Sequence, residues 1–130
     1  TTRSYYLADR TLEQLNGGGI SFLKNNLEKT ISFTLPAPCL YKNGILFSGR
    51  NNKGDVLLTF LKSLNISPDK VIFIDDKLKN LEVVENALKT RKIDFVGIRY
   101  SKCDELVKNF EPKKAHKCYQ DFLKQRSSNR

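Results

Sequence analysis

A short run of apolar residues organises the pattern of hydrophobic and polar positions. Residues 71–74 read Val-Ile-Phe-Ile and lead directly into two adjacent acids, Asp75 and Asp76. An amphipathic pattern with helical spacing follows over 78–90, and a second apolar run occupies 93–98. Strand, helix and strand joined by short links predict a parallel βαβ unit. We expect the first run to be a buried parallel strand.

Two helices are predicted before this unit. The pattern over 1–15 predicts a helix that starts at once, and the Asn-Gly-Gly-Gly sequence at 16–19 ends it because glycine accepts the left-handed cap conformation. Residues 51–64 predict a second helix. The apolar faces of the two helices are expected to contain Tyr6, Leu7, Leu12 and Leu15, and Val56, Leu57, Phe60, Leu61 and Leu64.

The stretch from Leu27 to Arg50 has β character. Apolar and polar residues alternate over 31–35, which is typical of a half-buried strand. Asn43-Gly44 then separates two short apolar runs and favours the primed turn of a β-hairpin. We interpret residues 31–47 as a small hairpin insertion or flap outside the parallel sheet.

The end of the chain predicts two more helices, over 102–110 and 112–125, followed by a basic tail at 126–130. No segment has the composition of a linker, so the expected organisation is a single domain over 1–130. The expected fold class is α/β, with a partial Rossmann-like parallel sheet flanked by helices and carrying the hairpin insertion.

Composition and charge narrow the functional classes. The 130 residues are 39% hydrophobic and 28% charged, as in a globular domain, and no apolar run approaches 18 residues. The net charge of +9 favours anionic partners. Among anionic partners, nucleic acid is the one the sequence supports least. No nucleic-acid recognition motif accompanies the lysines, and a lysine-rich face is usually exposed to solvent without binding a partner. The basic residues near the end are Lys113, Lys114, Lys117, Lys124, Arg126 and Arg130.

The cysteines give an expectation about the cellular compartment, and the lack of methionine gives one about whether the chain is a fragment. Cys39, Cys103 and Cys118 are odd in number and far apart, so we expect isolated reduced thiols and a cytoplasmic protein rather than a disulfide framework or a zinc site. Methionine is absent. We therefore expect that the chain was processed or is a fragment of a longer protein, from which any signal peptide would be missing.

The acid pair is the main candidate for chemistry. Two neighbouring carboxylates at a strand end repel each other unless a cation or a shared proton offsets the charge, and carboxylates with water and phosphate oxygens suit Mg²⁺. The alternative is that Asp75 ends the strand and Asp76 caps the next helix. Lys53 stands in the first turn of a predicted helix, where a nearby anion would offset the unfavourable dipole. Its alternative is an ordinary lysine with its ammonium group in water.

These residues together resemble a known family. Thr1 or Thr2, then Lys53-Gly54, then residues 71–77 with Asn80, are similar in order to the second, third and fourth motifs of the haloacid dehalogenase-like (HAD) hydrolases, in particular of a poorly characterised bacterial branch. The similarity extends over nearly all of the chain up to Tyr100. It implies a HAD-type Rossmann-like fold and a Mg²⁺-dependent phosphatase.

The resemblance implies a role for each matching residue. Thr1, or the adjacent Thr2, would hydrogen-bond and bind the phosphoryl oxygens of the substrate. Lys53 would balance the negative charge of nucleophile and phosphate. Asp75 and Asp76 would hold Mg²⁺, directly or through water. In the family an aspartate attacks phosphorus and forms an aspartyl-phosphate, while a second aspartate acts as general acid and base.

The sequence departs from the family at one point. The first motif, Asp-x-Asp-x-Thr after a strand, is absent, so we expect the nucleophile on an upstream segment or a second chain, which would also supply the missing central strand. Alone, the 130 residues are expected to be inactive. Asn80 would steady the metal shell or Lys53. The resulting hypothesis is the C-terminal portion of a phosphomonoester hydrolase; the alternative is a catalytically inactive phosphate- or protein-binding module on the same scaffold.

Overall fold

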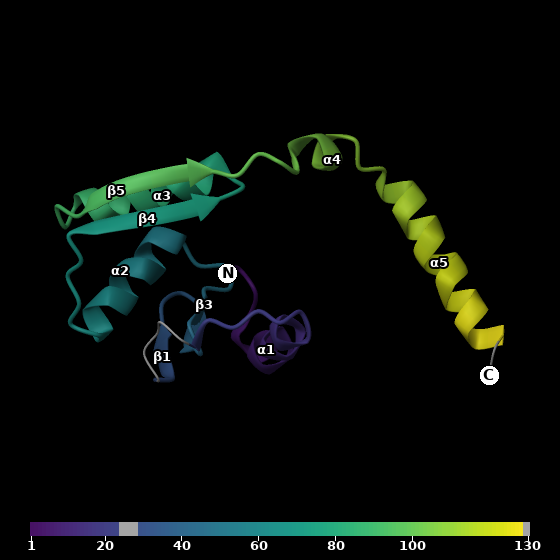
Figure 1. Cartoon of the computed structure of the whole chain (residues 1–130), viewed down its shortest axis with the longest axis horizontal. Coiled ribbons are helices and arrows are strands. Elements are labelled where there is room, and N and C mark those ends of the chain that lie inside the picture. The colour runs from purple at the N-terminus through teal and green to yellow at the C-terminus, as the bar shows by residue number, and fades with distance from the viewer. Residues whose placement is uncertain (24–28, 129–130) are drawn as a thin grey trace. The chain divides into compact units, whose positions relative to one another are not determined.

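The computed structural model describes residues 1–23 and 29–128, and shows a mixed α/β chain with helices and small sheets (Figure 1). Leu27 and Glu28, which belong to the predicted β stretch, lie outside the described residues. The chain forms two compact units, Thr1–Arg99 and Tyr100–Arg130, and each is described by itself.

The helices and strands of the first unit follow the predicted order in most places. In chain order they are the 3₁₀ helix η1 (Tyr5–Leu7), α1 (Ala8–Gly17), β1 (Ile31–Thr34), β2 (Pro38–Lys42), β3 (Ile45–Phe47), α2 (Lys53–Ser63), β4 (Lys70–Asp75), α3 (Leu78–Lys89) and β5 (Asp94–Arg99).

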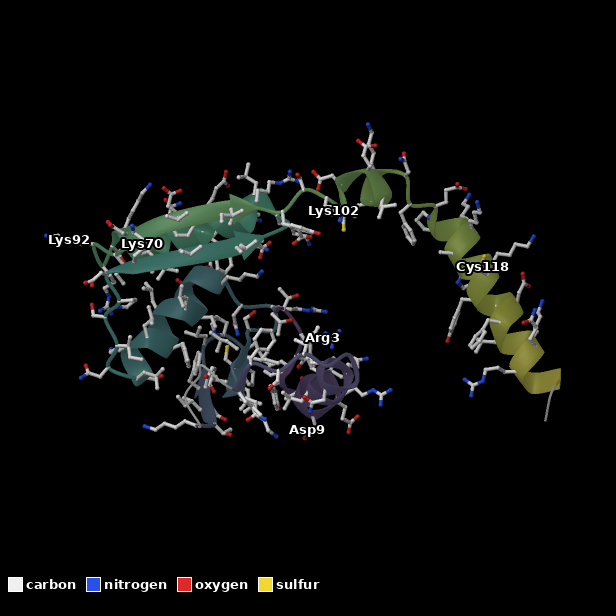
Figure 2. The ribbon with its side chains drawn as sticks, in the orientation of Figure 1. Arg3, Asp9, Lys70, Lys92, Lys102 and Cys118 are labelled. Atoms are coloured by element: carbon white, nitrogen blue, oxygen red, sulfur yellow. The ribbon has the colours of Figure 1, made fainter. Side chains whose placement is uncertain are left out.

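The predicted βαβ unit is present as β4, α3 and β5. The two strands pair in parallel, with Val71 opposite Phe95 and Asp75 opposite Arg99. Lys70 begins β4, and Lys92 lies in the turn that precedes β5 (Figure 2). Helices α2 and α3 pack on one face of this pair around a core of buried and partly buried side chains: Leu57, Leu58, Leu61, Val71, Phe73, Val84, Leu88, Ile93 and Phe95.

The predicted burial of β4 on both faces is wrong. Val71 and Phe73 point into the core, whereas Ile72 and Ile74 alternate with them and are 64% and 60% exposed. In residues 1–23 and 29–128, β4 pairs only with β5, and helices cover one side of the pair. A continuous apolar run is typical of a strand covered on both faces, but covering the second face requires another layer.

The predicted hairpin is confirmed, and its strands belong to an antiparallel sheet in the order β1-β2-β3. Asn43 and Gly44 have φ angles of 50° and 80°, as a primed turn requires. Helix α1 packs on this sheet through Ala8 against Ile45 and Phe47. The rings of Tyr41 in β2 and Phe60 in α2, with centres 4.7 Å apart, connect the antiparallel sheet with helix α2.

The prediction that a helix starts at Thr1 is wrong. Residues 1–3 are not helical, because their backbone pairs with the chain around β3: the Thr1 nitrogen donates to Leu46 O at 2.9 Å, and Ser48 N donates to Thr1 O at 2.8 Å. Because the first helix starts later than predicted, the residues on its packing face also differ from the prediction. Tyr6 is 74% exposed and Leu7 is exposed, while Ala8 and Thr11 are buried. The predicted glycine stop is confirmed, since α1 ends at Gly17.

The second unit contains α4 (Asp104–Lys108) and α5 (Pro112–Ser128). The predicted helix over 102–110 is shorter than expected, because Pro112 disfavours helical backbone at the residue before it and instead starts α5. The prediction of a tail at 126–130 is wrong up to Ser128, since no helix breaker precedes that residue; Asn129 and Arg130 lie outside the described residues.

Candidate functional site

The carboxyl end of β4 holds a buried ion pair. Asp75 is the last residue of the strand, and its Oδ2 pairs with the ammonium group of Lys53 at the start of α2. The two side chains are 6% and 19% exposed. Oδ1 of Asp75 accepts hydrogen bonds from the backbone N–H of Lys77 at 2.9 Å and from Nδ2 of Asn80 at 2.8 Å. The structure therefore brings together three of the residues singled out from the sequence.

The hydrogen bonds decide the ionisation of Asp75. Burial raises the pKa of its carboxyl, but the hydrogen bonds from Lys53, from the Lys77 N–H and from Asn80, with the positive charge of Lys53, outweigh burial and lower the pKa to about 2. Asp75 is consequently ionised at neutral pH and holds a fixed negative charge beside Lys53.

The position of Lys53 follows from the local sequence. Asn52 is the N-cap of α2, and its side chain accepts from Gly54 N at 2.8 Å and Asp55 N at 3.3 Å, which fixes where the helix begins. The Lys53 ammonium also lies 5.7 Å from the centre of the Phe73 ring. The alternative of a lysine with its head group in water is wrong.

Asp76 has a different environment from its neighbour. It is exposed, and its carboxylate makes no ion pair with any residue in 1–23 or 29–126. The N-cap of α3 is Lys77, which makes no side-chain capping bond. The alternative interpretation of Asp76 as a helix cap is therefore wrong, and its carboxylate is available to a ligand.

The two carboxylates at this strand end are of the type that binds Mg²⁺, but they differ in how accessible they are to an ion. In proteins Mg²⁺ is commonly bound by one or two carboxylates together with water and phosphate oxygens. Oδ1 of Asp75 accepts hydrogen bonds from the Lys77 N–H and from Asn80, and Oδ2 pairs with Lys53. The exposed Asp76 carboxylate, in contrast, is accessible to an ion. No cluster of three or more His, Cys, Asp or Glu exists among the described residues. If Mg²⁺ binds at this strand end, the exposed Asp76 carboxylate would be the available ligand of the two, because both oxygens of Asp75 already have partners in the protein.

Thr1 and Thr2 lie near Lys53 in two separate cavities. Thr1 lines a cavity of about 260 Å³ with Lys53 and residues 71–73, and Thr2 lines one of about 680 Å³ with Lys53 and Asn80. The Thr1 hydroxyl accepts from Arg3 N at 3.3 Å. Both threonines therefore border cavities that contain Lys53, but among the described contacts neither hydroxyl bonds to Lys53 or Asp75.

Comparison with known proteins assigns the chain to a family. Residues 1–129 match the family described as "Protein of unknown function (DUF2608)". The chain belongs to this family. Its description assigns no activity.

Relatives of this family member come from Chlamydia and Rickettsia species. A "Putative outer membrane protein" of Chlamydia trachomatis is 37% identical over 72% of this chain and 34% of its own length. One of the same name from Chlamydia pneumoniae is 36% identical over 82% of this chain and 39% of its own. An "Uncharacterized protein" of Rickettsia prowazekii is 33% identical over 66% of this chain and 32% of its own. The chain thus spans about a third of the length of these relatives.

Two further findings concern similarity to solved structures and the length and polarity of the helices. No solved structure matches the chain. In residues 1–23 and 29–128, every helix is too short or too polar to cross a lipid bilayer.

Sequence reasoning missed Asn51, which fixes the loop leading to Lys53 in this family member. Its Nδ2 donates to Ala37 O at 2.9 Å and Ser48 O at 3.0 Å, and its Oδ1 accepts from Ala37 N at 3.0 Å. The asparagine pair at the start of the predicted helix over 51–64 was a usable signal, because Asn is a favoured N-cap residue and stabilises turns, and α2 in fact begins after it at Lys53.

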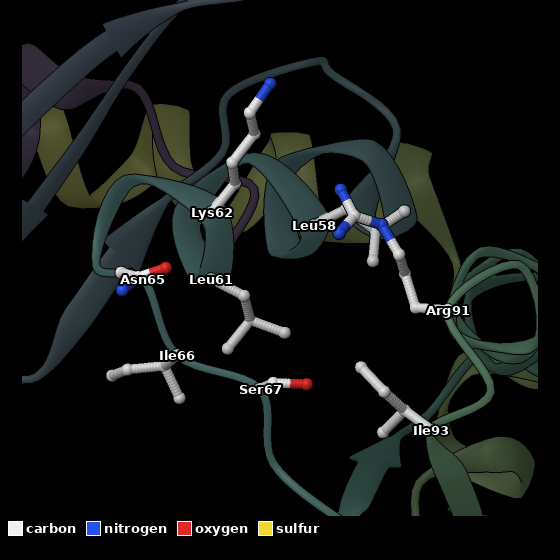
Figure 3. Close-up of a pocket in the computed structure, with 8 residues that line it drawn as sticks. All are labelled: Leu58, Leu61, Lys62, Asn65, Ile66, Ser67, Arg91 and Ile93. Carbon is white, nitrogen blue, oxygen red and sulfur yellow. The ribbon is translucent and has the colours of Figure 1, made fainter.

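A different cavity lies at the opposite end of the strands. It has a volume of about 200 Å³ and is lined by the loop before β4 and the link before β5, including Ile66 and Ile93 (Figure 3). Lys62 and Arg91 also line it, and Figure 3 shows the Lys62 side chain extending away from Leu61. This cavity is remote from Asp75 along β4, so it does not belong to the candidate site.

The thiols lie apart from the candidate site as well. Cys39 is buried, while Cys103 and Cys118 are exposed, and all three are free. Burial raises the pKa of the Cys39 thiol, because its effect is larger than that of the hydrogen bond with Asn51, which lowers the pKa. Cys39 therefore stays protonated and serves the packing of β2.

Proposed function

We propose that this chain is the C-terminal portion of a Mg²⁺-dependent phosphatase of HAD type that hydrolyses a phosphomonoester. Its parallel strands with helices on one side would be part of a Rossmann-like sheet. The observation that supports the proposal is the ion pair of Lys53 with Asp75 at the carboxyl end of β4, with the unpaired Asp76 beside it. Ligands of open α/β sheets collect at this end of the strands.

Each residue of the chain would have a separate task. Asp75 holds the Lys53 ammonium in place, and Asn80 and the Lys77 N–H fix the carboxylate of Asp75. Lys53 then provides positive charge for a phosphoryl group without reorganisation. Thr1 or Thr2 would donate a hydroxyl to phosphoryl oxygens. Bound Mg²⁺, held by Asp76 and supported by Asp75, would neutralise the charge on the phosphoryl oxygens.

The nucleophile is the part of the proposal that these residues do not supply. No Asp-x-Asp-x-Thr sequence occurs in the chain, so the aspartate that forms the aspartyl-phosphate would come from a segment or chain outside residues 1–130. The alternative function is a phosphate- or protein-binding module without catalysis, which would be favoured if the motif were also absent from the full-length protein. The phosphatase and a phosphate-binding module both require phosphate to bind beside Lys53.

The test measures binding and turnover separately. Titration calorimetry with inorganic phosphate, with and without Mg²⁺, is performed on the chain and on Lys53→Met and Asp76→Asn. Hydrolysis of 4-nitrophenyl phosphate is measured on the full-length natural protein. Asp69→Asn, an exposed acid just before β4, is the matched control.

The phosphatase predicts a defined pattern. Phosphate binding should be lost in Lys53→Met, the enhancement by Mg²⁺ should be lost in Asp76→Asn, and Asp69→Asn should keep both. The full-length protein should turn over substrate only with Mg²⁺. Phosphate binding without turnover would establish the binding module, and phosphate binding that is unaffected by Lys53→Met would overturn both functions.

A further inference from the structure

A basic cavity borders the ion pair, and three of its cations, Arg50, Lys77 and Lys79, have no side-chain role in the function proposed above. It has a volume of about 680 Å³ and lies between the loop that joins β3 to α2 and the first turn of α3. Its charged lining consists of Arg50, Lys53, Lys77 and Lys79, with no acidic residue. Such a concentration of positive charge in one cavity is unfavourable unless an anion offsets it.

Most of this charge has no partner in the protein. Asp75 compensates Lys53, whereas the side chains of Arg50, Lys77 and Lys79 make no ion pair with any carboxylate in 1–23 or 29–126. Asp76 adjoins Lys77 in the sequence but does not line the cavity. An excess of three positive charges is therefore available to a ligand.

The backbone around the cavity is held in place. Asn51 ties its loop to Ala37 and to Ser48, and Gly49 supplies the left-handed φ of +56° that the turn before Arg50 requires. On the other side, the Lys77 side chain makes no capping bond at the start of α3, where Lys77 N donates to Asp75 Oδ1 and Asn80 N donates to Lys77 O. A rigid loop and a helix start without a side-chain cap favour an anion between them.

The cavity continues into the candidate phosphoryl site. Lys53 and Asn80 line it, and both contact the Asp75 carboxylate. A ligand with one phosphoryl group at Lys53 would therefore place the rest of its structure in the basic cavity. A neutral alcohol would leave the three cations uncompensated, whereas a second phosphoryl group would pair with them.

We propose that the cavity binds a second phosphoryl group, so that the substrates are phosphate esters with at least two phosphoryl groups. This inference rests on the proposed function, because it takes Lys53 as the site of the first phosphoryl group. Arg50, Lys77 and Lys79 are then residues that determine specificity, without a part in bond cleavage.

The experiment compares inorganic phosphate with pyrophosphate, both titrated into the purified chain at constant ionic strength. The test variant is Arg50→Gln/Lys77→Gln/Lys79→Gln. The control variant, Lys62→Gln/Lys70→Gln/Arg91→Gln, removes the same charges at the opposite end of the strands, two of them from the cavity of Figure 3. All six residues are exposed, so both variants are expected to fold.

The expected result is selective. The chain should bind pyrophosphate at least about tenfold more tightly than phosphate. The second phosphoryl group adds charge-assisted hydrogen bonds, and a single one of them is enough for about a tenfold difference in affinity. The test variant should bind both ligands equally weakly, and the control variant should retain the preference. Equal losses of pyrophosphate binding in the two triple variants, or no preference in the chain, would overturn the inference.

Lys53→Met separates this inference from the function on which it rests. If phosphate binding depends on Lys53 but the test variant keeps the preference for pyrophosphate, the second subsite is refuted and the phosphatase stands. If pyrophosphate binds through Arg50, Lys77 and Lys79 but is unaffected by Lys53→Met, the cavity is an anion site and the proposed phosphatase is refuted.

Discussion

At the scale of single residues, Asp75 and Asp76 show how neighbours in sequence can differ in environment. Asp75 continues the inward alternation of Val71 and Phe73, so its side chain is buried and bonded to Lys53. Asp76 follows the end of the strand and is exposed. The first acid therefore stabilises the structure, and the second is the one that can exchange partners.

Replacing Asp75 tests this difference by stability. Asp75→Asn should lower the free energy of unfolding by about 3 kcal/mol, because it leaves the part-buried Lys53 ammonium without its counter-charge. Asp76→Asn should change it by no more than about 0.5 kcal/mol. Urea unfolding followed by circular dichroism provides both values. Comparable losses in the two variants would show that Asp75 has no special structural role.

The pH dependence of stability follows from the same carboxyl. The pKa of Asp75 is about 2 in the folded chain and about 4 in an unfolded one. Between these values the unfolded state binds more protons, so stability falls as pH is lowered through this window, by up to about 2 kcal/mol. Unfolding measured at several pH values between 2 and 6 should show this fall in the natural chain and a smaller one in Asp75→Asn. Parallel curves would exclude a depressed pKa at this residue.

At the scale of helices and strands, the close approach of α2 to α3 positions the ion pair. Gly54 lies at their contact: a Cβ atom there would be 2.5 Å from the carbonyl oxygen of Val83 and 2.7 Å from the Cβ of Ala87. Only glycine permits this approach, which sets Lys53, the preceding residue, beside the end of β4. The Lys-Gly sequence thus has a packing reason in addition to any chemical one.

Substitution of Gly54 should separate packing from helix propensity. Gly54→Ala should destabilise the chain by about 1–3 kcal/mol, since the backbone of α3 has to move, although alanine favours helices by about 1 kcal/mol over glycine. Gly17→Ala in the last turn of α1 is the matched control, because its Cβ would meet nothing within 4 Å. Thermal unfolding should show a lower midpoint for the first variant and an equal or higher one for the second. A stabilised Gly54→Ala would contradict the contact.

At the scale of the whole molecule, the net charge of +9 acts on every anion, so specific binding has to be distinguished from general attraction. Much of the positive charge of the second unit lies on α5, which carries Lys113, Lys114 and Lys117 near its start. These lysines are exposed, as expected of a solvated face. The basic cavity, in contrast, is confined to the first unit.

Retention on heparin and binding of pyrophosphate should therefore depend on different residues. The variant Lys113→Gln/Lys114→Gln/Lys117→Gln should elute from heparin at lower salt, because it lacks three charges that attract polyanions over long range. Its affinity for pyrophosphate should stay within about twofold of the natural chain, since none of these three lysines lines the basic cavity. A large loss of pyrophosphate affinity in this variant would show that net charge, and not the cavity, binds the anion.

Much of the architecture was predictable because its signals are local. The period of apolar residues predicted α2, α3, β4 and β5, Asn43-Gly44 predicted the hairpin turn, and the glycines predicted the end of α1. Failures occurred where distant backbone competed with local preference. Thr1 pairs with Leu46 and Ser48 across more than 40 positions and is extended rather than helical.

The sequence by itself determined the helices and strands, the parallel βαβ unit and the residues of interest at its end, since each depends on neighbours within a few positions. Only the tertiary structure decided that Lys53 meets Asp75 across 22 positions, that Asp76 is left unpaired, and that Arg50, Lys77 and Lys79 share one cavity. Periodicity predicts which face of an element is buried, but not which other element covers it. The pairing of charges depends on that choice, because Coulomb attraction and burial act through space and not along the chain.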